Sequence, residues 1–132
     1  MQLAMNPTRI LHVDDEPDIR EIVDLSLGLN PAFEVREVGS GAEAIEAAAE
    51  WSPDLILLDV MMPKMDGPAT LERLHDNPKT SGIPVLFMTA RSQTREVERF
   101  KLLGAKGVIL KPFDPMTLAA EVQGHLQALK AS

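Results

Sequence analysis

Short apolar segments alternate with longer segments of helical period along the chain, and this alternation is the feature that most restricts the fold. The apolar segments are Ile10–Val13, Phe33–Val38, Leu55–Leu58, Val85–Met88 and Val108–Leu110. The helical segments that follow them cover about residues 17–29, 40–50, 67–76, 92–103 and 115–130. Strands joined by helices form parallel sheets, because each helix returns the chain to the end of the sheet from which it left. The sequence therefore predicts an α/β fold, a doubly wound parallel sheet of five strands with helices on both faces.

Two of the predicted strands differ in pattern, and the difference predicts their places in the sheet. Leu55–Leu58 is apolar at successive positions, as a strand that is covered on both faces requires. Phe33–Val38 alternates between apolar and charged residues, which is typical of a strand with one exposed face. We therefore expect Phe33–Val38 to be an edge strand.

The starts of three helices carry specific signals. Pro17 and Pro115 stand where the first helical residue is expected, and Asp114 can cap the helix that follows it. Ser40 and Glu43 have the spacing of a capping box, in which each side chain bonds a backbone N–H of the first turn. These signals support the predicted helix boundaries.

Length and charge limit the domain content and the partners. A chain of 132 residues fits one domain, residues 1–132, with a core over about residues 8–130. Only Ala131 and Ser132 follow the last predicted helix, so we expect no output domain in this chain. A net charge of −7 disfavours direct binding of nucleic acid or an anionic membrane. No cysteine, bilayer-length apolar run or export signal is present, which predicts a cytoplasmic protein.

Charged and polar side chains stand at the carboxyl ends of four predicted strands. Asp14 and Asp15 follow the first strand, Asp59 follows the third, Thr89 follows the fourth and Lys111 follows the fifth. In open α/β sheets, ligands bind at this edge. Each residue alone has an ordinary interpretation, such as a helix cap, a strand end or a solvated lysine. Their joint occurrence favours one shared site.

The three carboxylates of this site would repel one another, and one would normally take up a proton. A divalent cation removes the repulsion, and Mg²⁺ suits oxygen ligands, with Mn²⁺ as a substitute. Mg²⁺ usually shares such sites with phosphate oxygens, for which Lys111 and Thr89 are suitable partners. Because a carboxylate can act as a nucleophile, Asp59 is the candidate acceptor of a phosphoryl group.

The segments ILHVDDEPDIR, PDLILLDVMMPKMDG, VLFMTA and GAKGVILKPF cover most of the chain. In these segments the sequence resembles the receiver domains of response regulators in bacterial two-component signalling, including the chemotaxis receiver. The resemblance implies a flavodoxin-like fold with strand order 2-1-3-4-5. It also implies a phosphoacceptor switch rather than an enzyme. The expected donor is a phosphohistidine on a histidine kinase or a histidine phosphotransfer protein, and the expected target is another protein, unidentified here.

The resemblance also implies roles for individual metal ligands. Asp59 matches the phosphoacceptor and a metal ligand. Asp15 matches a direct Mg²⁺ ligand, and Asp14 matches a ligand that acts chiefly through water. The backbone carbonyl of Met61 matches a further ligand, so its thioether is not involved. Gly67 would complete the tight turn that follows the acceptor strand.

Two further positions match the family's response to phosphorylation. Thr89 matches the hydroxyl that moves to the phosphoryl group, and Lys111 matches the cation that pairs with it. The Lys111–Pro112 peptide bond is expected to be cis. Val108 departs from the family, which often has an aromatic switch residue there, so the output step is the open part of the resemblance.

Two other classes of protein place similar chemistry on a related sheet. A haloacid-dehalogenase-like phosphatase also forms an aspartyl phosphate, but it needs a second Asp two residues after the nucleophile, where Met61 stands. A flavodoxin-like cofactor binder needs a phosphate-cradling loop after the first strand, where Asp14, Asp15 and Glu16 would repel phosphate. Both alternatives are disfavoured.

Overall fold

The computed structural model describes residues 6–91 and 93–131, and within these residues five strands alternate with five helices. The strands are β1 (Thr8–Val13), β2 (Phe33–Val38), β3 (Leu55–Asp59), β4 (Val85–Thr89) and β5 (Gly107–Leu110). The helices are α1 (Pro17–Leu27), α2 (Gly41–Trp51), α3 (Gly67–Asp76), α4 (Thr94–Leu102) and α5 (Leu118–Ala131). No helix in the described residues is long and apolar enough to cross a membrane.

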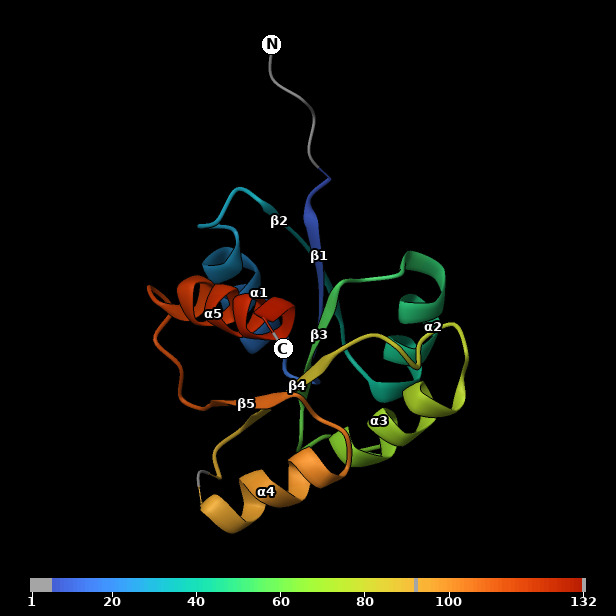
Figure 1. Ribbon diagram of the computed structural model, residues 1–132. Helices are drawn as coiled ribbons and strands as arrows, with labels where there is room; N and C mark the ends of the chain where they lie inside the picture. Colours follow the sequence, from blue (N-terminus) through green and yellow to red (C-terminus); the bar gives the residue numbers. More distant parts are fainter. Residues whose placement is uncertain (1–5, 92, 132) are drawn as a thin grey trace.

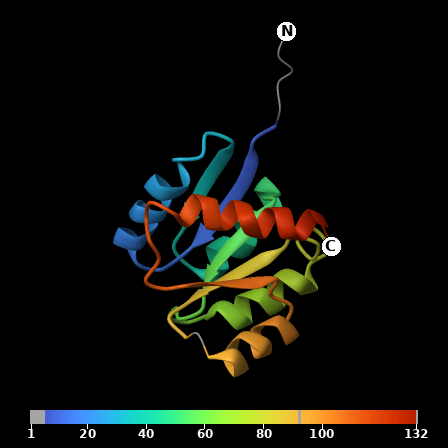
Figure 2. The ribbon, with the colours of Figure 1, turned by 60° about the vertical axis from the view of Figure 1, so that its left-hand side comes forward.

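The strands form one parallel sheet in the order β2-β1-β3-β4-β5, which confirms the predicted strand order (Figure 1). Helices α1 and α5 cover one face, and α2, α3 and α4 cover the other. The turned view shows α5 lying across the sheet on the side of α1 (Figure 2). From β1 the chain moves to β2 at one edge of the sheet, and from β3 it moves through β4 to β5 at the other edge. The carboxyl ends of β1 and β3 therefore form the switch point of the sheet.

An apolar layer fills each side of the sheet. Every residue of β3 and β4 is buried, as expected for strands that helices cover on both faces. Between the sheet and α4, the rings of Phe87 and Phe100 meet edge to face with 4.9 Å between their centroids. Strand β2 has one exposed face and lies at an edge, as its alternating pattern predicted.

The helix starts agree with the sequence signals in two of three cases. Pro17 is the first residue of α1. The Ser40 hydroxyl accepts a hydrogen bond from the Glu43 N–H at 3.1 Å, and the Glu43 carboxylate accepts one from the Gly39 N–H at 3.1 Å. The reciprocal bond of the capping box is therefore made one residue before the cap.

The predicted start of the last helix at Pro115 is wrong, because α5 begins at Leu118. The Asp114 carboxylate accepts a hydrogen bond from the Met116 N–H at 2.8 Å, which closes a turn over residues 114–116. The Asp114 carbonyl then accepts from the N–H groups of Thr117 and Leu118. Asp114 thus organises a turn ahead of the helix. The predicted start of α4 at residue 92 lies outside the described residues, and the helix begins at Thr94.

Candidate functional site

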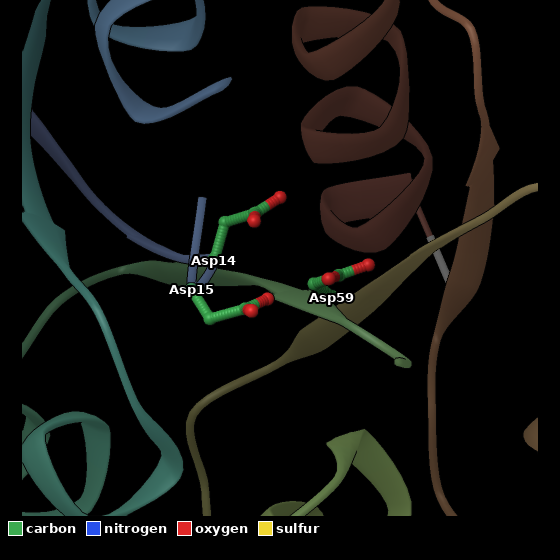
Figure 3. A group of neighbouring side chains, drawn as sticks. All are labelled: Asp14, Asp15 and Asp59. Atoms are coloured by element: carbon green, nitrogen blue, oxygen red, sulfur yellow. The ribbon is translucent and has the colours of Figure 1, made fainter. Parts of the chain in front are cut away.

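Three carboxylates meet at the switch point of the sheet. Asp14 and Asp15 follow β1 and Asp59 ends β3; because Val13 pairs with Leu58, Asp14 and Asp59 are neighbours across the two strands. One carboxylate oxygen from each residue lies within 4.8 Å of the others. The three side chains extend to the same side in Figure 3. The three acids that the sequence assigned to one site therefore lie together, and their roles as ligands and acceptor stay predictions.

Lys111 joins two of these carboxylates. It follows β5, and its side chain reaches over the end of β4 to donate to Asp59 Oδ1 at 3.0 Å and to Asp14 Oδ2 at 3.1 Å. The Lys111 N–H also bonds the Thr89 carbonyl at 2.8 Å, which fixes the start of the loop. The Lys111–Pro112 peptide bond is cis, as expected. One ammonium group thus lies among three acids.

The charges in the site do not balance. Burial raises the pKa of Asp59, the charges of Asp14 and Asp15 raise it further, and the hydrogen bond from Lys111 opposes both effects. Burial would lower the pKa of Lys111, but its hydrogen bonds and charge interactions with Asp59 and Asp14 raise the pKa overall. Lys111 is therefore fully protonated near neutral pH. Three carboxylates and one ammonium leave an excess of two negative charges, which a divalent cation with a preference for oxygen ligands would neutralise.

The hydrogen bonds distinguish the two acids of the β1 loop. Asp14 is fully buried, and both of its carboxylate oxygens are occupied, Oδ1 by the Glu16 N–H at 2.9 Å and Oδ2 by Lys111. The Asp15 carboxylate accepts no hydrogen bond from the residues that the structure describes, and its residue is half-buried. Asp15 therefore has oxygen lone pairs available for a further ligand, whereas those of Asp14 are largely engaged.

Thr89 and Met61, which both lie near the acids, differ in exposure to solvent. Thr89 is the last residue of β4 and is 3% exposed, and its hydroxyl accepts a hydrogen bond from the Arg91 N–H at 3.1 Å. This bond holds the hydroxyl toward the β4–α4 loop. Met61 is 73% exposed, so its thioether lies in solvent. The metal-ligand role of its backbone carbonyl stays a prediction.

Gly67 stands where a side chain has no room. A Cβ added at this position would lie 2.7 Å from the Asp59 carbonyl oxygen and 2.9 Å from Val60 Cα. The Gly67 N–H bonds the Val60 carbonyl at 2.9 Å and closes the turn after β3. Because the chain returns this closely to the end of β3, the position requires glycine.

Sequence reasoning missed three features near the acids. Arg20 donates to the Asp14 backbone carbonyl at 2.7 Å. The only sequence signal for this bond was the position of Arg20, early in the helix that follows the acidic pair. His12 and Glu37, from neighbouring strands, form a short, partly buried hydrogen bond of 2.5 Å between Nδ1 and Oε1. An apolar groove of about 400 Å³ opens beside Lys111. It is lined by Glu16, Ile19, Ile22, Ala90, Pro112, Phe113 and Pro115.

Known proteins share this fold and sequence. The family model of the response regulator receiver domain matches residues 10–123. The chain is 36% identical over 119 residues to the DNA-binding response regulator MtrA of Mycolicibacterium smegmatis, with 90% of this chain and 50% of that protein covered. It is 35% identical over 126 residues to the response regulator Rre1 of Synechocystis sp., with 96% and 54% covered. The chemotaxis response regulator CheY4 of Vibrio cholerae has a TM-score of 0.83 at 30% identity, over 90% of this chain and 98% of that one.

The fold and the acidic site at its switch point define a two-component signalling domain. The chain belongs to the response regulator receiver domain family. It spans between 26% and 54% of the length of the first curated relatives that it matches. The activities of those whole proteins are therefore not assigned to this chain. The predicted family and fold class are confirmed, and nothing in the comparisons favours a haloacid-dehalogenase-like phosphatase.

Proposed function

We propose that this receiver domain accepts a phosphoryl group on Asp59 from a phosphohistidine of a histidine kinase or a histidine phosphotransfer protein. The observation that carries the proposal is the position of Asp59: it ends a buried strand, among two further acids and a lysine within hydrogen-bond distance. In the transfer, an Asp59 carboxylate oxygen attacks phosphorus, the bond between phosphorus and the histidine nitrogen breaks, and an acyl phosphate forms. The electron pair of the broken bond leaves with the imidazole.

The donor set fits Mg²⁺, because every candidate ligand is an oxygen and the excess charge is −2 before the ion binds. Asp15, Asp59 and the Met61 carbonyl would hold the ion directly, and Asp14 would act chiefly through water. The hydrogen bonds already made by both Asp14 oxygens support this division. When bound, the ion would offset the charge of the transferring phosphoryl group, as Mn²⁺ would in its place. Lys111 adds a second positive charge, already directed at Asp59.

Thr89 and the elements around it form the proposed output of the switch. In the structure, the Thr89 hydroxyl bonds the Arg91 N–H rather than an acid of the site. A phosphoryl oxygen on Asp59 is a charged acceptor for the Thr89 O–H, so the hydroxyl would turn toward it to donate, lose the bond that it accepts from the Arg91 N–H, and release the start of the β4–α4 loop. The surface of α4, β5 and α5 would then change its contacts with a downstream protein.

The apolar groove beside Lys111 is the proposed contact site for the phosphohistidine partner. Ile19 and Ile22 of α1 and Phe113 of the β5–α5 loop supply an apolar floor next to the acids. A helix that carries the phosphohistidine can bury apolar side chains there while its imidazole points at Asp59. We propose residues 8–130 as the receiver domain core and do not assign nucleic-acid binding to it.

Phosphorylation by acetyl phosphate tests the proposal without a kinase, because the acceptor, the ligands and Lys111 all lie in this chain. Intact-mass spectrometry of the chain with acetyl phosphate and Mg²⁺ should show one added phosphoryl group. The signal should vanish with a chelator and in Asp59→Asn, and persist in Asp76→Asn, which changes an exposed acid at the end of α3. Full labelling of Asp59→Asn, or labelling that does not depend on the metal, would contradict the proposal.

A further inference from the structure

Arg20 connects the first helix to the backbone of the acidic loop. It lies one turn inside α1, where its own N–H bonds the Glu16 carbonyl at 3.1 Å. Its side chain turns back, and Nη1 donates to the Asp14 carbonyl oxygen at 2.7 Å. This is a charge-assisted, partly buried hydrogen bond to the carbonyl of a buried residue next to the site.

The bonded carbonyl belongs to the peptide that joins Asp14 to Asp15. A peptide unit is planar, so fixing the direction of its C=O also fixes the position of the next Cα, which belongs to Asp15. The other contacts of the loop hold Asp14: its N–H bonds the Val38 carbonyl at 3.2 Å, and its carboxylate bonds Glu16 and Lys111. Within the described residues, the bond from Arg20 is the hydrogen bond that the Asp14–Asp15 peptide accepts.

Gly39 packs against the guanidinium group of Arg20. A Cβ added to Gly39 would lie 3.0 Å from Arg20 Nη1 and 3.5 Å from Cζ, so the guanidinium lies directly on this glycine. The Gly39 N–H is bonded by Glu43, which keeps the residue in place at the start of α2. A Cβ at position 39 would therefore require the guanidinium to shift by a few tenths of an ångström.

We propose that Arg20 is a positioning residue, which orients the Asp14–Asp15 peptide so that the Asp15 carboxylate is placed for a divalent cation. This inference rests on the proposed function, since it concerns the same metal site. Arg20 bonds a backbone carbonyl that is not one of the candidate ligand oxygens. It acts through the backbone, as hydrogen-bond partners outside the ligand set of a metal site do.

The alternative is that Arg20 only ties α1 to the end of β1 and contributes to stability. The two roles predict changes in different measured quantities. A purely structural bond changes the free energy of unfolding and leaves the metal affinity of the folded chain unchanged. A positioning bond changes the metal affinity of the chain that is still folded.

The test compares Mg²⁺ affinity, measured by titration of backbone amide NMR shifts, in the full chain and in single variants. Arg20→Ala should bind Mg²⁺ about tenfold more weakly than the unchanged chain, the loss typical of removing such a partner. Arg20→Lys, which keeps a charged donor, should recover part of the affinity. Arg73→Ala, which removes the same charge from the exposed surface of α3, should bind as the unchanged chain does.

Gly39→Ala perturbs the same contact without changing Arg20. It should weaken Mg²⁺ binding less than Arg20→Ala does, because the guanidinium shifts only slightly, and the double variant should lose little more than Arg20→Ala alone, because both changes act on one contact. Equal Mg²⁺ affinity in Arg20→Ala and the unchanged chain would overturn the inference and leave the proposed function standing. Absence of Mg²⁺ binding in the unchanged chain would overturn both. A chain labelled by acetyl phosphate that shows the tenfold loss supports both.

Discussion

Lys111 is the only positive charge bonded to the carboxylate groups of the acids within the described residues, so its removal has a calculable cost. Lys111→Met keeps the apolar stem and removes the ammonium. The side chains of Asp14 and Asp59 are then left without a counter-charge, at 0% and 7% exposure. Breaking a fully buried ion pair costs about 3–5 kcal/mol. Because the Lys111 side chain is itself 21% exposed, we expect about 2–3 kcal/mol of lost stability at neutral pH.

Mg²⁺ should restore most of the lost stability, because it supplies the missing positive charge. In Lys111→Met the ion also binds the carboxylates without competition from the Lys111 ammonium. Urea unfolding, with and without saturating Mg²⁺, measures both quantities. Lys106→Met is the matched control, because it removes an exposed lysine that precedes β5. The control should change stability by less than about 0.5 kcal/mol. A Lys111→Met chain that is as stable as the control without Mg²⁺, or one that gains nothing extra from the ion, would refute the charge-balance argument.

Three further predictions concern the ligands, the lifetime of the acyl phosphate and the output. Asp15→Ala should weaken Mg²⁺ binding more than Asp14→Ala in a calorimetric titration; equal losses would show that both acids ligate alike. Met61→Asn should speed the loss of phosphate, followed by phosphorus NMR, because an amide orients the attacking water and an exposed thioether cannot donate to it. Beryllofluoride, a phosphoryl mimic, should shift the amides of the β4–α4 loop more than that of Val108, whose stiff side chain cannot swing as a ring does. A dominant change at Val108 would indicate a switch in β5.

The sequence predicted the fold because its signals were local. The apolar run Leu55–Leu58 and the alternating run Phe33–Val38 report directly how many faces of each strand are covered. The start of α5 was not predictable in the same way. Pro115 suits a first helical residue and also suits a turn, and the choice between them depends on the Asp114 carboxylate, which bonds the Met116 N–H.

Part of the candidate site was likewise predictable from the sequence, and part was not. Strand ends that share one edge of a parallel sheet bring Asp14, Asp59 and Lys111 together, so the sequence positions alone predicted the cluster. The direction of a long side chain depends on the packing around it, which no sequence spacing reports. For this reason the bond from Arg20 to the acidic loop and the partly buried pair of His12 with its neighbour on β2 emerged only from the structure.

Chemical mapping of the acyl phosphate tests the central claim most directly. Borohydride reduces an aspartyl phosphate to homoserine and thereby leaves a permanent mark on the residue that carried phosphate. After treatment with acetyl phosphate and Mg²⁺, tandem mass spectrometry should find homoserine at position 59, the end of β3. Homoserine at position 14 or 15, or no homoserine in a chain whose intact mass shows the phosphoryl group, would contradict the assignment of Asp59 as the phosphoacceptor.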